Sequence, residues 1–242
     1  MKNMTYKLVV LALVSFLPIA ATEQLRLYAQ PDKRDETRLQ RHVRLAKEKG
    51  ATSVEMTSPL PNYAEVDSLD QAMWSSAVLV VKLQDQTSVP SSSEDAIWTW
   101  YKLKVLRDLS DTPLPKETAL PPNVPLEIPA SILPLKGDEV LIRDTGGTVT
   151  VDGVEVRGKP LYEGFRKDGV YLLFADLTGF SNSETLTRFG RPAFGPYGIF
   201  KVDAGGQIQP LSKDFNDFPL TRALRERFAN SLERFSLFFQ RY

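Results

Sequence analysis

The chain has 242 residues with 30 basic and 30 acidic side chains, no cysteine and a single histidine. This balance excludes the strongly positive field on which nucleic-acid binding depends, and the lack of cysteine excludes thiol catalysis, iron–sulfur clusters and thiolate zinc sites. The length suits one domain with appendages, which an apolar core can stabilise without disulfides.

The N-terminus has the pattern of a secretory signal peptide. Lys2 and Lys7 make this end positively charged, and the stretch 8–19 is almost entirely apolar. Ala20 and Ala21 are the small residues that a signal peptidase needs. About twelve apolar residues are fewer than the ~20 that a membrane-spanning helix needs. We therefore favour a cleaved signal peptide over a membrane anchor.

Removing a signal peptide of residues 1–21 changes the charge of the chain. The segment contains two lysines and no acidic residue, so the mature chain has 28 basic and 30 acidic residues, a formal charge of −2. We expect an exported protein, periplasmic or extracellular, with no nucleic-acid partner.

Residues 22–61 are expected to form a helical extension followed by a linker. A helix that begins near Pro31 and ends near Gly50 carries both signs of charge along most of its surface. Mixed charges favour a solvated helix lying against the domain over a basic binding surface. The linker is the polar stretch that ends in Pro-Leu-Pro. The narrow apolar stripe of the helix consists of Leu39, Val43 and Ala46.

Residues 62–211 are expected to form the main domain, which is rich in β-strands. The Asp-Gly pair at 152–153 lies between alternating valines, which is the strongest short-range signal for a hairpin. The Gly-Gly pair at 146–147 provides a bend that tolerates positive φ, and the run 170–174 suits a strand buried on both faces. Five segments are expected to form a closed or nearly closed barrel: 77–84, 96–107, 138–144, 168–176 and 198–211.

A proline-rich stretch at 110–134 separates two of these strands. Proline cannot donate a hydrogen bond to a sheet, so the stretch is expected to be an insertion with edge pairing only. Loops of this length are usually functional or mobile.

Residues 212–242 are expected to form a C-terminal amphipathic helix. Arginines outnumber glutamates there by five to two, which would suit an anionic surface. A helix at the end of a chain most often docks on its own domain, so intramolecular packing ranks first, self-association second and membrane contact third. The apolar stripe consists of Leu220, Leu224, Phe228, Leu232, Phe235 and Phe239.

Five segments between Val66 and Leu211, a stretch of about 60% of the chain, carry a resemblance to a known type of protein: Ala77-Val-Leu-Val-Val, Tyr101-Lys-Leu-Lys-Val, Thr145-Gly-Gly, Gly169-Val-Tyr-Leu-Leu-Phe and Gly198-Ile-Phe-Lys-Val. Their order resembles uncharacterised secreted bacterial proteins with an oligosaccharide-binding (OB)-type β-barrel, similar to the tissue-inhibitor/netrin-like domain. The resemblance implies a small OB-type barrel flanked by the charged N-terminal helix and the amphipathic C-terminal helix. Those inhibitors bind the protease metal through an N-terminal cysteine, and this chain has none, so that activity is excluded.

The sequence contains no recognisable catalytic or metal-binding motif. His42 lies in the charged helix, and no Gly-x-Ser-x-Gly elbow accompanies it, so we expect a surface histidine. The acidic pairs Asp138-Glu139 and Glu94-Asp95 would point to opposite faces of a strand and are expected to be solvated charges. We expect no catalytic residue, metal or cofactor. A carboxylate pair distant in sequence, as in glycosidases, stays an open alternative.

Aromatic residues are the candidates for a binding surface. Trp98 and Trp100 share one face of a strand, where they either pack in the core or form a stacking platform for a glycan or peptide. Phe189, Phe194 and Tyr197 lie on a turn-prone stretch and allow the same two interpretations. Packing is the more frequent role of such residues.

These observations favour an exported, non-catalytic binding or protein-interaction module with an unknown protein or glycan partner. Two alternatives remain. One is a secreted hydrolase with a carboxylate-based site, and the other is an envelope-associated structural protein that uses the C-terminal helix.

Overall fold

The fold comes from a computed structural model that describes residues 36–57, 66–73, 75–116, 127–160, 162–178 and 185–239. The expected signal peptide at 1–21 and the expected helix start near Pro31 lie outside these residues. The chain divides into the units Met1–Glu36 and Thr37–Tyr242, and every described helix and strand belongs to the second unit.

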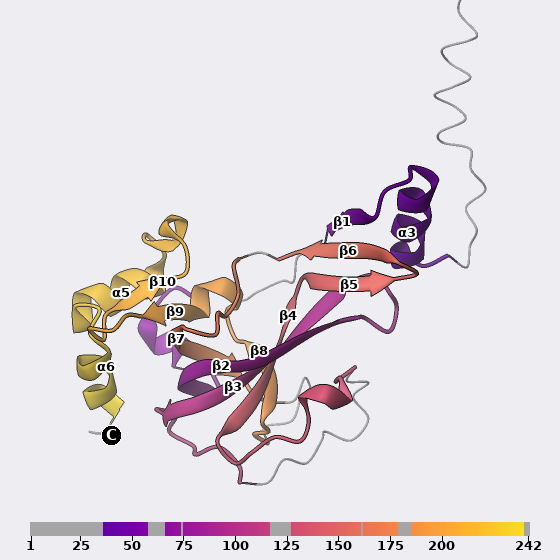
Figure 1. The fold of residues 1–242 in the computed structure, drawn as a ribbon. Coiled ribbons are helices and arrows are strands. Elements are labelled where there is room, and N and C mark those ends of the chain that lie inside the picture. The colour runs from indigo at the N-terminus through magenta and orange to yellow at the C-terminus, as the bar shows by residue number, and fades with distance from the viewer. Residues whose placement is uncertain are drawn as a thin grey trace, which may run out of the picture. The chain divides into compact units, whose positions relative to one another are not determined.

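The protein is mainly β, with ten strands in two sheets in the described part of the chain. The strands of the larger sheet are β2 (Ala77–Pro90), β3 (Ile97–Asp108), β4 (Glu139–Thr145), β7 (Val170–Asp176), β8 (Phe189–Pro192), β9 (Ile199–Val202) and β10 (Ile208–Pro210). Their order is β10-β9-β7-β2-β3-β4-β8, and β8 also pairs with β7 (Figure 1). All of these pairs are antiparallel except β4 with β8.

Four of the five expected barrel segments coincide with β2, β3, β4 and β7. The fifth, 198–211, forms a hairpin of β9 and β10, in which β9 pairs with the edge of β7 away from β2. The strand that pairs with both β4 and β7 is β8, which lies in the stretch expected to be a turn-prone loop. A side chain at Gly190 would overlap the backbone carbonyl of Asp176, so this close pairing requires a glycine. Glycine is unfavourable in strands, which is why the sequence did not indicate a strand here.

The smaller sheet consists of β1 (Ser53–Thr57), β5 (Gly147–Val151) and β6 (Val154–Lys159). β6 is central, parallel to β1 and antiparallel to β5. The hairpin expected at 152–153 joins β5 to β6, with positive φ at both turn residues. The expected linker is wrong over 53–57: this polar stretch is a strand because every second residue, Val54 and Met56, packs under a helix.

That helix is α3 (Arg38–Glu48), which lies beside the smaller sheet in Figure 1. It begins at Arg38 because Thr37 and Gln40 form a capping box. The Thr37 hydroxyl also donates to the Glu94 carboxylate at 2.6 Å, which attaches the helix to the β2–β3 loop. The expected stripe of Leu39, Val43 and Ala46 is buried against the sheet.

β7 and the first five residues of β2, 77–81, are buried on both faces, as the apolar run at 170–174 indicated for β7. Leu79 and Leu173 point into one cluster, enclosed by β2, β3, β4 and β7. Val80 and Leu172 point into another, between the sheet and the helices α4 (Leu69–Ala72), α5 (Pro219–Phe228) and α6 (Leu232–Phe239). Because successive side chains of β2 and β7 point to opposite faces of the sheet, this strand pair contributes to both hydrophobic clusters.

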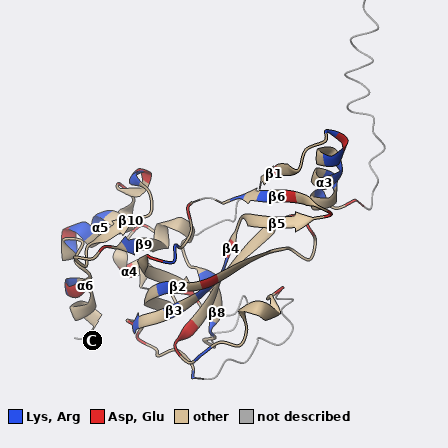
Figure 2. Ribbon diagram, viewed as in Figure 1, with Lys and Arg blue, Asp and Glu red and all other residues tan. Residues whose placement is uncertain are grey.

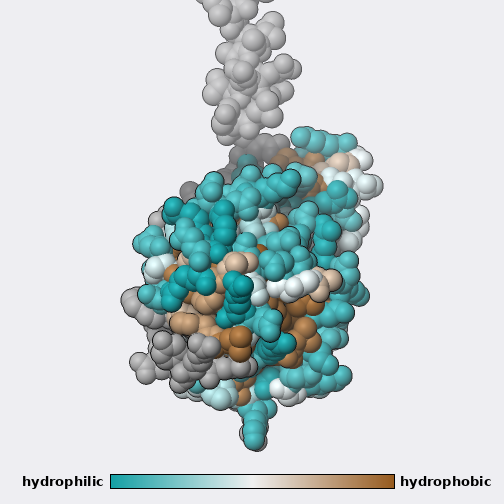
Figure 3. Space-filling model, turned by 90° about the vertical axis from the view of Figure 1, so that its left-hand side faces the viewer, coloured by the Kyte–Doolittle hydropathy of each residue, from teal (hydrophilic) through white to brown (hydrophobic). Residues whose placement is uncertain are grey.

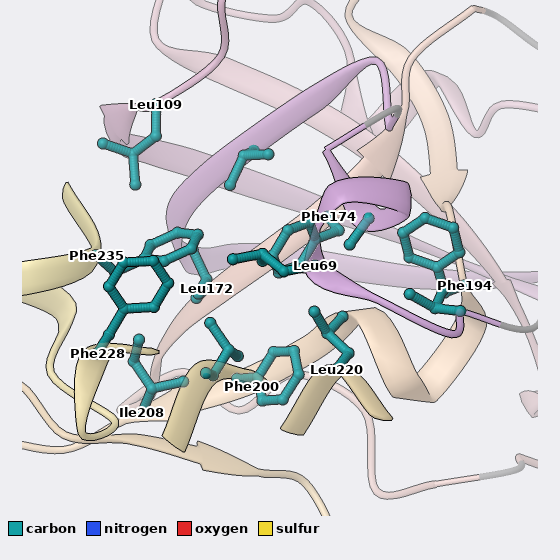
Figure 4. Packing of buried hydrophobic residues seen from close by; sticks show 14 of the residues in the cluster. Leu69, Leu109, Leu172, Phe174, Phe194, Phe200, Ile208, Leu220, Phe228 and Phe235 are labelled. Atoms are coloured by element: carbon teal, nitrogen blue, oxygen red, sulfur yellow. The ribbon is translucent and has the colours of Figure 1, made fainter. Parts of the chain in front are cut away.

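The C-terminal segment forms two helices, so the expectation of one helix is corrected. Ala229 and Asn230 both have left-handed φ angles, 51° and 57°, which end α5 and redirect the chain. The turn brings Phe228 and Phe235 together, with ring centroids 5.1 Å apart, against Phe174 of β7. Figure 4 shows these rings packed with side chains from the strands. The helices therefore pack on their own domain.

The end of the proline-rich insertion covers the outer face of β3 and β4. Its 3₁₀ turn η1 (Ala130–Ile132) places Ile132 in a fully buried cluster with Leu141 and Phe189. The buried Arg188 guanidinium donates to the carbonyls of Pro115 at 2.6 Å and Glu139 at 2.9 Å, which holds β8 between the insertion and β4. Two further 3₁₀ turns are η2 (Gly195–Gly198) and η3 (Lys213–Phe215).

Candidate functional site

The five aromatic residues expected as a binding surface do not gather at one site. Trp100 and Phe189 are buried together beneath the insertion, with 0% and 1% of their surface exposed. Phe194 is buried in the cluster under the C-terminal helices, and Tyr197 stacks on Phe218 beside it. Trp98 is half-buried, with the Arg143 guanidinium 4.7 Å from its ring centroid. Packing is thus the role of Trp100, Phe189 and Phe194.

A large open cleft lies elsewhere. It has a volume of about 910 Å³ and lies where β2 and β3 meet the smaller sheet and the segment 162–167. Clefts of this size with a few converging polar groups are the usual sites for ligands. The residues that line it come from β1, β2, β3, β5, β6 and the segment that precedes β7.

One wall of the cleft is the polar face of the smaller sheet. Because side chains alternate along a strand, Val54 and Val156 face α3, while Glu55 and Arg157 face the cleft. Glu55 and Arg157 are register partners on β1 and β6. Lys159, two residues further along β6, lies on the same face and also lines the cleft.

The floor is aromatic and nearly closed to solvent. Tyr101 of β3 and Phe165 contact edge to face, with ring centroids 5.0 Å apart, and Phe165 contacts Tyr171 in the same way. Tyr101 is 8% exposed and Phe165 4%. Burial raises the pKa of Tyr101 well above its ordinary value, and Asp144 and Tyr171 add to this effect. The Tyr101 hydroxyl therefore keeps its proton and has no hydrogen-bond partner among the described residues.

Two glycines allow the cleft walls to approach each other. Gly147, at the start of β5, has φ +119°, and a side chain there would overlap the hydroxyls of Ser88 and Thr99. A Cβ at Gly164 would lie 2.6 Å from the Tyr101 hydroxyl. The Gly-Gly bend expected from the sequence is thus the point at which the smaller sheet docks on β2 and β3.

A tyrosine is held at the cleft by a buried carboxylate. The Tyr162 hydroxyl donates to Asp144 Oδ2, and Asp144 Oδ1 accepts from the backbone N–H of Thr145 at 2.7 Å. Asp144 is only 6% exposed, whereas Tyr162 is half-buried and lines the cleft. This arrangement fixes the Tyr162 ring and leaves part of its surface available to a ligand.

Cations outnumber acids around the cleft. Two acids, Glu55 and Glu163, line it together with four cations, Arg157, Lys159, Arg166 and Lys167. Arg157 pairs with Glu155 at 2.5 Å, and Arg166 pairs with Glu163 at 2.7 Å. Figure 2 shows the two signs next to each other on β6. Lys159 and Lys167 are exposed, and neither has an ion-pair partner in the described ranges.

The acidic pairs and the histidine lie outside the cleft. The expectation that Glu139 is a solvated charge was wrong: it is 5% exposed, its carboxylate lies 3.5 Å from Lys102 Nζ, and it accepts from the Lys136 N–H. Its neighbour Asp138 is exposed and pairs with Lys104. His42 Nδ1 lies 2.8 Å from the Arg38 carbonyl on α3. In the part of the chain that the structure describes, no three His, Asp or Glu side chains are grouped to hold a metal ion.

Sequence reasoning missed the cleft residues. A usable signal was the stretch Lys159–Lys167, in which two aromatic residues and three cations surround a glycine, much like the turn-prone stretch that contains Phe189, Phe194 and Tyr197. The partners of this stretch could not be found in that way. Ser88 and Thr99 are register partners of the β2–β3 pair, and Thr148 lines the same cleft only because β5 docks on these strands.

Comparison of the chain with protein-family models, curated proteins and solved structures found no match. The chemistry of the cleft is therefore the basis for assigning a role. It offers hydroxyls, two lysines that have no ion-pair partner among the described residues, and one partly exposed aromatic ring, a set suited to holding a polar ligand.

Proposed function

We propose that this protein is an exported, non-catalytic binding module whose ligand occupies the cleft between β2, β3 and the smaller sheet. The observation that carries the proposal is the cleft itself, about 910 Å³ in volume, with converging hydroxyls and cations above an aromatic floor. One of its two acids, Glu163, is engaged by Arg166 at 2.7 Å and by Lys201 at 3.7 Å, which disfavours a pair of free catalytic carboxylates.

The proposed scaffold is an OB-type barrel made of β2, β3, β4, β8 and β7. Two short contacts support closure of these strands: β4 with β8 at Leu141 and Ile142, and β7 with β8 at Ala175 and Asp176. OB-type barrels commonly serve as binding modules. Export is proposed from the charged and apolar pattern of residues 1–21.

A substitution that fills the cleft tests the site. Thr148 is exposed on β5 and lines the cleft, so Thr148→Trp places a large side chain in the binding volume without disturbing the core. Thr150 lies two residues along on the same exposed face but does not line the cleft, so Thr150→Trp is the matched control. The full-length protein is screened against saccharide and peptide arrays, and hits are quantified by calorimetry.

We expect Thr148→Trp to weaken binding of the hits about tenfold or more, because a filled site loses most of its contacts, and Thr150→Trp to bind as the wild type does. Equal binding by the wild type and Thr148→Trp would show that the cleft is not the site. Cleavage of a bound probe would contradict the non-catalytic part of the proposal.

A further inference from the structure

We propose that the ligand of the cleft is an acidic saccharide, held by Lys159 and Lys167 through its carboxylate or sulfate groups. This inference rests on the proposed function, because it names the ligand class of the same site. Three features of the cleft carry it: two lysines without ion-pair partners among the described residues, a hydrogen-bond acceptor and a donor that suit a sugar hydroxyl, and walls that offer a peptide little apolar surface.

The charge argument concerns which cations are available. Arg157 and Arg166 are already engaged by carboxylates at 2.5 and 2.7 Å. Lys159 on β6 and Lys167 before β7 are exposed and lack ion-pair partners within the described residues. A lysine ammonium acts as a point charge with three N–H donors, so it can donate to carboxylate, sulfate or phosphate oxygens from several directions. The cleft therefore has two positive groups to offer an anion.

The hydroxyl argument follows from the direction of one hydrogen-bond chain. Thr99 Oγ1 donates to the Gly146 carbonyl at 2.7 Å, which uses its only proton. Ser88 Oγ lies 2.8 Å from Thr99 Oγ1, so Ser88 must be the donor of that bond. Ser88 is left with acceptor capacity facing the cleft, while the Tyr101 hydroxyl, on the same face of β3 as Thr99, is left as a donor.

A sugar hydroxyl both donates and accepts, so it can use an acceptor and a donor that line the same cleft. The half-buried ring of Tyr162, fixed by Asp144, adds a flat surface against which a sugar ring can pack. Gln86 and Thr148 provide further polar groups along the cleft.

An acidic peptide fits the cleft less well. Leu83, Tyr101 and Phe165 of the floor have between 4% and 8% of their surface exposed, so there is little apolar surface for peptide side chains. Addition of a peptide strand needs a free strand edge. β6, the strand of the cationic wall, has both edges occupied, by β1 and by β5.

Calorimetry with the full-length protein at low salt tests the ligand class. The probes are tetragalacturonate, its neutral methyl ester, a tetrasaccharide that carries only sulfate groups, and tetraglutamate. We expect an acidic tetrasaccharide to bind about tenfold or more tighter than the methyl ester, since each charge-assisted hydrogen bond contributes appreciably. Preference for the galacturonate or for the sulfated probe identifies the acidic group.

The lysines are tested with a double variant. Lys159→Gln with Lys167→Gln should remove the preference for the acidic probe, while Lys49→Gln with Lys213→Gln, two exposed lysines outside the cleft, should keep it. Equal binding of the acidic tetrasaccharide and its methyl ester would overturn the inference. If Thr148→Trp abolishes that binding, the proposed function of the cleft as a binding site is still supported. Binding of tetraglutamate alone that depends on the two lysines would also overturn the inference, and so would the absence of binding to any saccharide. The proposed binding function is tested separately, by the array screen with Thr148→Trp.

Discussion

The indole nitrogen of Trp100 donates a hydrogen bond to the backbone carbonyl of Glu127 at 3.0 Å. The bond joins β3 to the returning end of the proline-rich insertion, and the ring is fully buried with Ile132, Leu141 and Phe189. Trp98, two residues earlier on the same face of the strand, is half-buried beneath Arg143. The two tryptophans lie on the same face of β3 but have different roles, because the insertion covers only one of them.

This difference predicts unequal stability effects. Trp100→Ala removes a buried ring and leaves the Glu127 carbonyl without its donor, so it should lower the free energy of unfolding by about 3–5 kcal/mol. Trp98→Ala is the matched control and should cost about 1 kcal/mol or less, as partly exposed positions usually do. Urea denaturation measures both. Similar losses in the two variants would show that the insertion does not bury Trp100.

Helix α6 allows a second matched comparison. Phe235 is fully buried against Phe174 and Phe228, whereas Leu237 on the same helix is 45% exposed. Phe235→Ala should destabilise the protein by about 3–5 kcal/mol, and Leu237→Ala by less than about 1 kcal/mol. Thermal denaturation separates them; a small effect of Phe235→Ala would mean that the helix is not docked in solution.

Membrane contact by these helices is tested in the same samples. None of the helices in the described ranges is long and apolar enough to cross a bilayer. Figure 3, which views the face at the left of Figure 1, shows hydrophobic side chains in separate patches between hydrophilic ones. We expect no sedimentation of the full-length protein with anionic liposomes. If the protein does sediment with liposomes and Leu237→Ala reduces this binding, membrane contact rather than intramolecular docking would be the main role of the helix.

Tyr101 should make stability depend on alkaline pH. In the unfolded chain its hydroxyl loses a proton near the ordinary value of about pH 10, whereas burial raises its pKa in the folded protein. The stability contributed by the neutral hydroxyl is fully present below about pH 10 and is lost as the pH rises above it. Urea denaturation between about pH 9 and 11 should show a shallower decline for Tyr101→Phe than for the wild type. Identical slopes would argue against burial of this hydroxyl.

Export predicts a defined N-terminus. If residues 1–21 are a signal peptide, the exported protein should begin near Thr22, because Ala20 and Ala21 are the small residues before the cleavage site. Mass spectrometry of protein recovered outside the cytoplasm measures this directly. Exported protein that retains Met1 would contradict cleavage.

Local patterns in the sequence were sufficient for the central strands and their turns. The runs at 77–81 and 170–174 are apolar at every position, so each run was expected to be buried on both faces whichever strands paired with it. The turn at 152–153 depends on two adjacent residues that tolerate positive φ, and it forms where expected. The stripe at Leu39, Val43 and Ala46 likewise predicted the buried face of α3.

Tertiary contacts decided the elements whose own composition is ambiguous. β8 is a strand only because Gly190 lets its backbone reach Asp176, and β1 is a strand only because β6 pairs with it beneath α3. The cleft depends on the same kind of contact: Ser88, Tyr101 and Tyr162 come from separate segments and meet where Gly147 allows β5 to dock. A periodic pattern encodes burial within one segment, whereas strand pairing and close backbone approach depend on two segments at once, so only the folded chain could reveal the site.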